Sequence, residues 1–149
     1  MKKVEGFTLI ELMIVIVIVA VLLMVALPAY QNSIIKSNRS AGRGILQDVT
    51  ARQEQYYINN KVYSTTLSSL GYSVDVDGAF YIDNQVDKIN AADSDSVYKI
   101  GIIKLSTLAY SVTAETLGRQ AKDTRCGNFT ITGKGEKSNS GPGGADECW

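Results

Sequence analysis

The stretch GFTLIELMIVIVIVAVLLMVALPAY, residues 6–30, decides the first half of the fold. From Leu12 to Leu27 it carries no charged or strongly polar side chain. As a helix, the span from Phe7 to Leu27 is about 32 Å long, enough to cross a hydrocarbon core of about 30 Å. One carboxylate, Glu11, interrupts the apolar run near its start. The stretch therefore predicts a membrane-inserted helix that carries one charge in need of an explanation.

The rest of the 149-residue chain is polar and long enough for one further domain. Lysine plus arginine and aspartate plus glutamate both number 15, so the net charge points neither to a nucleic acid nor to an acidic ligand. The chain has no histidine, which excludes histidine-based catalytic triads and histidine metal sites. We expect no enzyme activity, no catalytic residue, no cofactor, no metal and no small-molecule substrate.

Two cysteines, Cys126 and Cys148, lie near the C-terminus. Beyond a membrane segment, such a pair suggests an oxidising compartment and one disulfide. Two unrelated free thiols are the alternative.

The N-terminal segment admits three explanations. A secretory signal has a basic start, an apolar stretch and a small-residue cleavage site. Lys2 and Lys3 provide the basic start, which keeps the N-terminus in the cytoplasm. Leu27 stands where a signal cleaved after Ala29 needs a small residue, and the apolar stretch is long for a removable signal. A plain uncleaved anchor is the second explanation.

The third explanation accounts for more of the residues. A short polar leader ends in glycine, an aromatic residue starts the apolar run, a carboxylate follows four residues later, and a proline ends the run. This pattern resembles the class III signal of type IV pilins and related pseudopilins, in which a membrane peptidase cuts before the apolar helix and leaves that helix on the mature protein. The matching residues are Gly6, Phe7, Thr8, Leu9, Ile10, Glu11, Pro28 and Tyr30. The resemblance implies cleavage of the Gly6–Phe7 bond and N-methylation of the new Phe7 amine.

The resemblance also implies a role for Glu11. A lone carboxylate at the centre of a bilayer costs at least about 2.5–3.5 kcal/mol, but cleavage gives Phe7 a positive α-amine. We expect Glu11 of one chain to pair with the Phe7 amine of a neighbouring chain inside a helix bundle. Such a pair fixes the axial register, because an unpaired buried charge is costly. The alternative is a glutamate that reaches the membrane interface without a partner.

Helical periodicity continues beyond Pro28, where we expect a kink. We predict one long helix from about Thr8 to about Tyr57, ended by Asn59-Asn60. Gly42 and Gly44 weaken this helix by roughly 1 kcal/mol each relative to alanine. The apolar stripe expected to pack under the soluble domain is Ile34, Ala41, Ile45, Val49 and Tyr56.

The remainder of the chain predicts a sheet. Residues 60–96 are acidic and rich in turn residues, and predict a loop with little regular structure. VYKIGII (97–103) and LAYSVTAE (108–115) alternate as strands, and CGNFTITGKGEK (126–137) adds a third strand and a short fourth. We therefore expect an α+β fold: a long kinked N-terminal helix packed on a C-terminal antiparallel sheet of about four strands, with a loop-like tail held by Cys148.

Three further patterns carry weaker signals. Asp75, Asp77, Asp93 and Asp95 gather carboxylates but lack the ligand series of a calcium loop, so we interpret them as solvated turns. Two asparagines, in NRS (38–40) and NFT (128–130), match the N-glycosylation sequon, which carries little weight in a bacterial family. A basic patch is either a solvated face or a DNA contact; its members are Lys122, Arg125, Lys134 and Lys137.

The segments ARQEQYY (51–57), CGNFTITGKGEK and ADECW (145–149) are more locally similar to the PilE-type minor pilins of type IVa pili. The resemblance implies a leader peptide at 1–6, a transmembrane and filament-core helix at 7–28, and a periplasmic globular domain at 29–149. Before assembly, the chain would cross the bacterial inner membrane once, with its N-terminus in the cytoplasm; after assembly it would lie in the extracellular pilus.

The implied function is that of a structural subunit of a type IV pilus. Its partners would be prepilin peptidase, the inner-membrane assembly machinery and other subunits of the helix bundle, and its roles pilus assembly, twitching motility, adhesion or DNA uptake. A type II secretion pseudopilin and a major pilin are the alternatives within the resemblance. A membrane-anchored enzyme is the alternative outside it.

Overall fold

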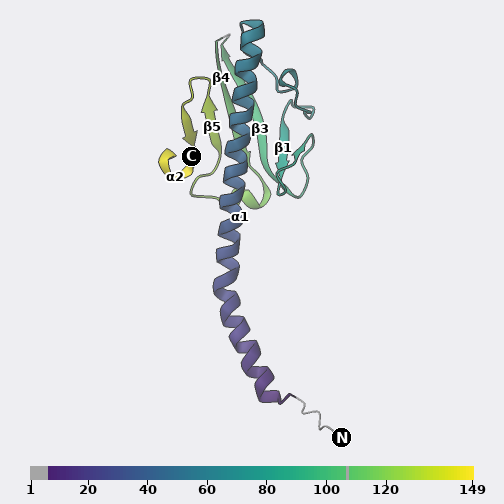
Figure 1. Cartoon of the computed structure of the whole chain (residues 1–149), viewed down its shortest axis with the longest axis vertical. Coiled ribbons are helices and arrows are strands. Elements are labelled where there is room, and N and C mark those ends of the chain that lie inside the picture. Colours follow the sequence, from purple (N-terminus) through teal and green to yellow (C-terminus); the bar gives the residue numbers. More distant parts are fainter. Residues whose placement is uncertain (1–6, 107) are drawn as a thin grey trace. The chain divides into compact units, whose positions relative to one another are not determined.

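The computed structural model of the chain describes residues 7–106 and 108–149, so the predicted leader, including Gly6, lies outside the described residues. The chain divides between Ile34 and Ile35 into two compact units, which we describe separately. Helix α1, Leu9–Asn60, contributes to both units (Figure 1). Its bounds agree with the long helix that the periodicity predicts.

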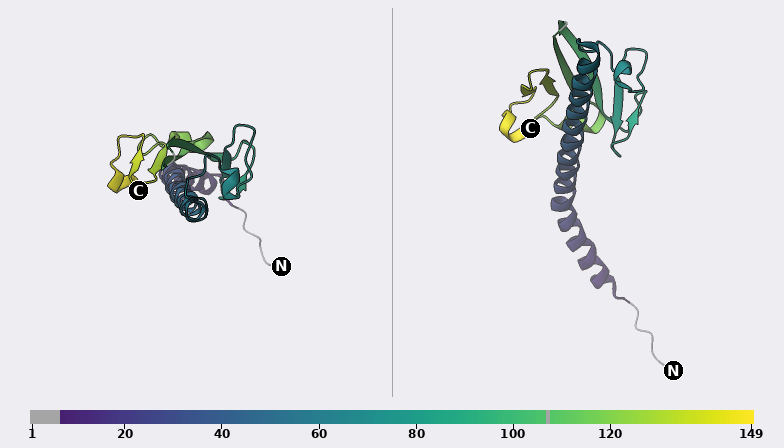
Figure 2. Two further views of the ribbon diagram at one scale, coloured as in Figure 1. Left: turned by 90° about the horizontal axis from the view of Figure 1, so that it is seen from above. Right: turned by 45° about the horizontal axis from the view of Figure 1, so that its top comes forward.

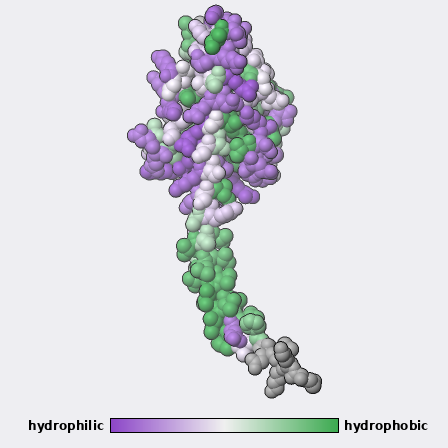
Figure 3. All heavy atoms as spheres, viewed as in Figure 1, coloured by the Kyte–Doolittle hydropathy of each residue, from purple (hydrophilic) through white to green (hydrophobic). Residues whose placement is uncertain are grey.

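The N-terminal unit is the apolar part of α1. Every residue from Phe7 to Leu27 is exposed, and the most apolar 18-residue window has a mean hydropathy of 3.2 with none of it buried. Figure 3 shows this part of the helix as a nearly continuous apolar surface. By length and composition it is able to cross a membrane. The helix continues through Pro28 without a break, and the kink there stays a prediction.

In the C-terminal unit, the distal part of α1 lies across one face of an antiparallel sheet (Figure 2). Two of the five residues of the expected apolar stripe, Ile45 and Val49, are buried, whereas Ile34, Ala41 and Tyr56 are only partly covered. Gly42 is buried as well, and a Cβ there would lie 3.0 Å from Cε2 of Tyr98. The residues that α1 buries are spaced three or four apart: Asn38, Gly42, Ile45, Leu46, Val49 and Gln53.

In the described part of the chain the sheet has six strands, in the order β2-β1-β3-β4-β5-β6, and each neighbouring pair is antiparallel. The two central strands form a long hairpin, and each edge ends in a short strand (Figure 1). The strands are β1 (Phe80–Asp83), β2 (Lys88–Ile89), β3 (Ser96–Ser106), β4 (Ala109–Thr116), β5 (Phe129–Thr132) and β6 (Lys137–Asn139).

The α+β class is confirmed, and the four expected strands are β3 to β6. The loop expected over residues 60–96 is wrong in part, because it contains β1, β2 and a 3₁₀ turn, η1 (Ser68–Leu70). Strand β1 gives no alternating signal because both of its faces are covered. Tyr81 is only 7% exposed and donates a hydrogen bond of 2.6 Å to Asp75, so three successive residues of a four-residue strand are buried.

One hydrophobic core lies between α1 and the sheet of this unit. Its largest fully buried apolar side chains are Tyr98, Tyr110, Phe80, Phe129, Leu46 and Leu67. A second 3₁₀ turn, η2 (Gly118–Lys122), follows β4, and the tail expected as a loop contains a short helix, α2 (Ala145–Cys148).

Candidate functional site

Glu11 closes the first turn of α1. Its Oε2 accepts hydrogen bonds from the Thr8 backbone N–H at 3.0 Å and from the Thr8 hydroxyl at 2.8 Å. The Glu11 N–H donates in return to the Thr8 Oγ1 at 3.3 Å. This reciprocal pair is a capping box, which satisfies backbone donors that a helix start leaves without partners. The carboxylate therefore has a role within its own chain, in addition to any role between chains.

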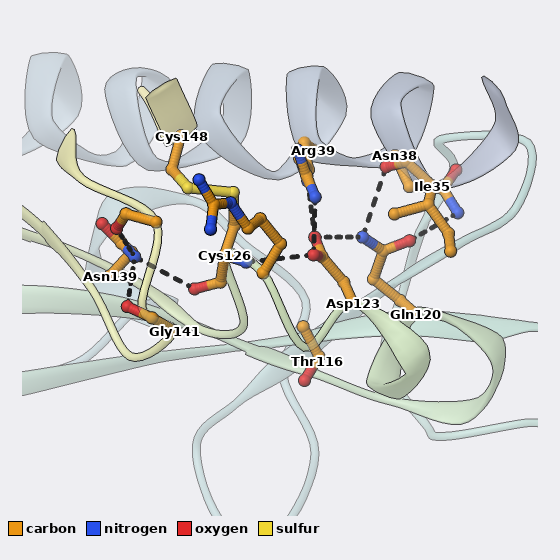
Figure 4. Close-up of polar contacts among 12 residues, drawn as sticks. Ile35, Asn38, Arg39, Thr116, Gln120, Asp123, Cys126, Asn139, Gly141 and Cys148 are labelled. Carbon is orange, nitrogen blue, oxygen red and sulfur yellow. Dashed lines mark hydrogen bonds and ion pairs between the residues drawn. A yellow bond between two sulfur atoms is a disulfide. The ribbon is translucent and has the colours of Figure 1, made fainter. Parts of the chain in front are cut away.

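A buried ion pair joins α1 to the segment after η2. Arg39 donates from Nε and Nη2 to the two carboxylate oxygens of Asp123, both at 2.6 Å. The Asp123 side chain is fully buried, whereas that of Arg39 is 15% exposed. Figure 4 shows the arginine reaching from the helix toward the loop that carries the aspartate. A bidentate pair of this kind fixes both distance and orientation.

Gln120 extends the ion pair into a network. Its Oε1 accepts from the Asn38 amide at 3.1 Å, and its Nε2 lies 3.3 Å from both the Ile35 carbonyl and Asp123 Oδ2. The Cys126 N–H donates to Asp123 at 3.1 Å. Burial by itself would raise the pKa of Asp123, but the hydrogen bonds from Arg39 and Cys126 outweigh it and hold that pKa below its ordinary value. The pair is therefore ionised at neutral pH.

The disulfide lies next to this network. Cys126 and Cys148 are bonded, with their Cα atoms 5.6 Å apart and both residues almost fully buried, as predicted (Figure 4). The loop that they close is held from inside by Asn139, whose Nδ2 lies 2.8 Å from the Gly143 carbonyl and 3.0 Å from the Gly141 carbonyl. The loop is thus an ordered part of the unit despite its glycines.

The last residues are attached to the sheet by side chains. The Trp149 indole N–H donates to the Ser138 carbonyl at 2.9 Å, and its ring packs edge-on against Phe129 at 5.5 Å. Arg125 pairs with Glu147, with Nη2 2.5 Å from Oε2. Both partners are about half exposed, so this second ion pair contributes little to stability.

The four predicted basic residues are all exposed. Lys134 lies in the β5–β6 turn, Lys137 begins β6, and Lys122 ends η2. Arg125 is engaged by Glu147, and Lys137 places its Nζ 5.4 Å from the ring centroid of Trp149. Residues 117–139 carry five basic and two acidic side chains, whereas residues 71–95, which include β1 and β2, carry six aspartates and one lysine. Asp146 and Glu147 of α2, which packs against β6, raise the acidic count on the first side to four. The half of the sheet that ends in β6 is therefore weakly basic, and the half that ends in β2 is acidic.

The carboxylates of the acidic half support turns. Asp75 Oδ1 accepts from the N–H groups of Asp77 and Ala79, and Asp93 Oδ1 accepts from the Asp95 N–H. These are Asx turns, in agreement with the interpretation of the aspartates as turn residues. Both sequon asparagines are also engaged: Asn38 is buried against Gln120, and the Asn128 side-chain oxygen accepts from the N–H and the hydroxyl of Thr116.

Sequence reasoning missed two features of this site. The capping box could have been predicted from the sequence, because T-x-x-E before an apolar run is its signature. The network around Asp123 was not, because its members come from Asn38-Arg39 and Gln120–Asp123, more than 80 residues apart in the chain. The one available signal was a pair of polar residues on the buried face of an amphipathic helix.

Comparisons with known proteins give the family. The sequence profile described as "Type IV minor pilin ComP, DNA uptake sequence receptor" matches residues 28–130, and the profile described as "Prokaryotic N-terminal methylation motif" matches residues 1–27. The two matches adjoin, and together they cover the chain up to the end of residue 130.

Curated relatives agree with the profiles. The "Fimbrial protein EcpC" of Eikenella corrodens is 33% identical over 118 residues, which are 78% of this chain and 74% of the relative. The "Type IV major pilin protein PilE" of Neisseria gonorrhoeae is 40% identical over 67 residues, 45% of this chain and 40% of the relative. A "Fimbrial protein" of Neisseria meningitidis is 38% identical over 78 residues, 51% of this chain and 46% of the relative. The chain thus spans less than half the length of these two Neisseria proteins.

A solved structure supports the fold. The type IV pilin of Shewanella oneidensis superposes with a TM-score of 0.51 over 77% of this chain and 97% of that protein, at 17% identity. The fold, the methylation motif, the matching profile and the Eikenella relative agree, and the chain belongs to the type IV pilin family.

Proposed function

We propose that the mature chain begins at Phe7 and is a minor subunit of a type IV pilus whose globular part binds DNA. The observation that carries the proposal is the match of residues 28–130 to the minor-pilin profile described as a DNA uptake sequence receptor, directly after the methylation motif at 1–27. The proposal joins two roles, assembly through the N-terminal helix and DNA binding through the sheet.

The N-terminal helix carries the first role, assembly into the filament. Prepilin peptidase removes residues 1–6 at the Gly6–Phe7 bond, and the Phe7 amine is methylated. Helix residues 7–28 remain in the inner membrane until the assembly machinery moves the subunit into the filament, while residues 29–149 lie in the periplasm. The apolar side chains from Phe7 to Leu27 are all exposed, and such a surface needs either lipid or neighbouring helices around it. This supports a helix that lies first in the membrane and then in the filament core.

The geometry of Glu11 is compatible with pairing between chains. The capping box uses Oε2. A carboxylate offers about four acceptor sites on two oxygens, so Oε1 retains the capacity to accept from the Phe7 amine of a neighbouring subunit. One residue thus serves the helix start in its own chain and the axial register in the filament.

DNA binding is supported by the distribution of charge. Phosphate contacts dominate the affinity of proteins for DNA and come from exposed lysine and arginine. Lys122, Lys134 and Lys137 are exposed on the basic half of the sheet, and among the described residues none of the three is in an ion pair. The acidic half would repel the phosphate backbone, so the basic half is the side we propose for DNA.

The competing functions differ in what they predict. A type II secretion pseudopilin shares the N-terminal segment, but its deletion would affect secretion and not twitching. A major pilin would dominate sheared filaments in amount. A membrane-anchored enzyme would need a catalytic constellation; we propose a structural subunit because the family that the chain belongs to is one of structural proteins.

Processing is tested by the mass of the membrane-extracted protein. We expect the mass of residues 7–149 plus one methyl group on the N-terminal amine. A mature N-terminus at Met1, or one close to Tyr30, would show that the pilin pathway does not process this chain.

DNA binding is tested with the full mature chain in a zwitterionic detergent and a fluorescent duplex. Combined Lys122→Ala, Lys134→Ala and Lys137→Ala should lower affinity about tenfold or more. It should also reduce the slope of log K against log salt by about 0.9 for each lost phosphate contact. Lys99→Ala, on β3, is the matched control and should bind as the unmodified chain does. Failure of the unmodified chain to bind at low salt contradicts the DNA role, and normal binding by the triple variant contradicts the proposed surface.

A further inference from the structure

The short helix α2 brings two carboxylates to the side of the sheet that we propose for DNA. Residues 117–139 carry five basic and two acidic side chains, and α2, which packs against β6, adds Asp146 and Glu147. Both of these residues are exposed. The Cys126–Cys148 disulfide fixes the segment that carries them, so the two carboxylates are a constant part of this surface.

The two carboxylates differ in what they contact. Arg125 donates from Nε to Oε1 of Glu147 at 2.8 Å and from Nη2 to Oε2 at 2.5 Å. Among the described residues Asp146 is in no ion pair. The hydrogen bonds from Arg125 hold the pKa of Glu147 below its ordinary value, so this carboxylate is charged at neutral pH.

Glu147 contacts Arg125 in the way that a phosphate would. A guanidinium binds carboxylates and phosphates alike, through two parallel N–H···O bonds. The contact with Glu147 occupies Nε and Nη2 and cancels the charge of the arginine. Within the described part of the chain the other three predicted basic residues, Lys122, Lys134 and Lys137, are in no ion pair. Arg125 therefore differs from them in having an anion in place before DNA arrives.

The Arg125–Glu147 pair is able to open without disturbing the fold. The two side chains are 59% and 47% exposed, and an ion pair in such a position is weak because water and salt compete with it. The segment around Glu147 is held independently by the disulfide and by the packing of Trp149 on Phe129. A phosphate can thus replace Glu147 on the arginine at little cost in stability.

The pair also lies close to one of the lysines that we propose for DNA. Lys137 places its Nζ 5.4 Å from the ring centroid of Trp149, two residues after Glu147. On the other side, the Arg125 carbonyl accepts from the Gly143 N–H at 2.8 Å, just before α2. A phosphate backbone that contacts Lys137 therefore passes near Arg125.

We propose that Glu147 is an internal competitor of DNA: it occupies Arg125 in the free chain and gives way to a phosphate when DNA binds through the neighbouring lysines. The inference rests on the proposed DNA binding and adds a regulatory residue to that surface. Phosphate contacts carry no sequence information, so the competition weakens binding to every duplex alike. Retention of a duplex then depends on the contacts that it makes with its bases.

The test uses the full mature chain in a zwitterionic detergent and a fluorescent duplex of random sequence. Glu147→Gln keeps the size of the side chain and an acceptor for Arg125 but removes the charge. We expect binding at low salt to become about fivefold to tenfold tighter, and the slope of log K against log salt to steepen by about 0.9, the value of one phosphate contact. Partial unfolding would not produce a gain in affinity.

Asp146→Asn is the matched control, because it removes the same charge one residue away from a carboxylate that holds no arginine. It changes only the field around the surface, so we expect an effect of no more than about twofold. In an Arg125→Ala background, Glu147→Gln should likewise tighten binding by no more than about twofold, because no guanidinium is released. This double-mutant cycle isolates the pair from the net charge.

The outcomes separate this inference from the DNA role. If the unmodified chain fails to bind the duplex at low salt, the DNA role is overturned and the inference with it. If the chain binds but Glu147→Gln has unchanged affinity, the inference alone is overturned. The same holds if Asp146→Asn tightens binding as much as Glu147→Gln does, or if the gain persists without Arg125.

Discussion

Asp123 and Arg39 are partners with unequal environments. The aspartate is fully buried, whereas the arginine retains 15% exposure. A charge that loses its partner inside a protein is costly, and the cost is smaller when the remaining group reaches water. The residue that remains after a substitution therefore decides how much stability is lost.

Removing the arginine should cost more than removing the aspartate. Arg39→Ala leaves a buried carboxylate and should lower the free energy of unfolding by about 3–5 kcal/mol. Asp123→Ala leaves an arginine that can turn toward solvent and deprives the buried Cys126 N–H of its acceptor, so we expect a smaller loss of about 1–3 kcal/mol. Urea titration in detergent micelles, followed by the fluorescence of Trp149, the single tryptophan of the chain, measures both. Equal losses, or a larger loss for Asp123→Ala, would contradict the role we give to the unequal burial.

Glu11 combines two roles that a substitution can separate. Glutamine is accepted at this position of a capping box, so Glu11→Gln keeps the cap and removes the charge, whereas Glu11→Ala removes both. Because we attribute assembly to the charge pair with the Phe7 amine, both variants should insert in the membrane and be poorly incorporated into pili. Immunoblots of sheared filaments against membrane fractions measure this. If Glu11→Gln assembles normally and Glu11→Ala does not, the capping box alone explains why assembly needs a side chain at this position, and the charge pair is not needed.

At the scale of elements, the two glycines of α1 occupy different environments. Gly42 faces the buried Tyr98 ring, and a Cβ there would lie 3.0 Å from Cε2. Gly44 is exposed, and a Cβ there would meet nothing within 4 Å. The first glycine permits the helix to approach the sheet closely, whereas the second has no packing role in this unit.

The two alanine substitutions should change the free energy of unfolding in opposite directions. Gly44→Ala should raise the free energy of unfolding by roughly 1 kcal/mol, the difference in helix propensity. Gly42→Ala gains the same propensity but must displace a fully buried ring, and overpacking of this kind costs about 1–3 kcal/mol, so we expect a net loss. Thermal and urea unfolding of the two variants side by side measures the difference. A stabilised Gly42→Ala variant would show that Tyr98 has room to move.

The elements that were predictable are those with long periodic signals. Helix α1 and the hairpin of β3 and β4 repeat their pattern over many residues, so a single deviation does not hide them. Strands β1 and β2 were missed because they have four and two residues, and because β1 is covered on both faces. Length and one-sided exposure are what make a strand readable from sequence.

The site was predictable where it depends on local sequence. The Gly6–Phe7 junction, Glu11 and the cysteine pair are short patterns. Of these, the disulfide is present as expected, whereas cleavage before Phe7 and the pairing of Glu11 between chains stay predictions. The network of Arg39, Gln120 and Asp123 was not predictable, because it joins α1 to a segment whose position depends on the whole fold. Contacts between segments far apart in the chain, and not the residue types involved, limited what could be predicted from the sequence.

At the scale of the whole molecule, the disulfide decides whether the C-terminal tail belongs to the sheet. The bond joins residues 22 apart, which gives roughly 3 kcal/mol of stabilisation in the chain-entropy model. Without it, the tail would depend on the exposed Arg125–Glu147 pair, the contacts of Asn139 and the packing of Trp149 on Phe129. The disulfide makes no contribution to the start of α1 or to the apolar segment, because it joins residues 126 and 148.

Cys148→Ser should therefore separate processing from assembly. We expect normal membrane insertion and normal cleavage before Phe7, because both depend on the first 30 residues. We also expect a protease-sensitive C-terminus and less protein in sheared filaments, because the released tail no longer presents a fixed surface to neighbouring subunits. Cys126→Ser should give the same result, since it removes the same bond. Ser138→Ala is the control, an exposed substitution that leaves the carbonyl accepting from Trp149 in place. Protease resistance and filament content equal to those of the unmodified chain would show that the side-chain contacts hold the tail without the disulfide.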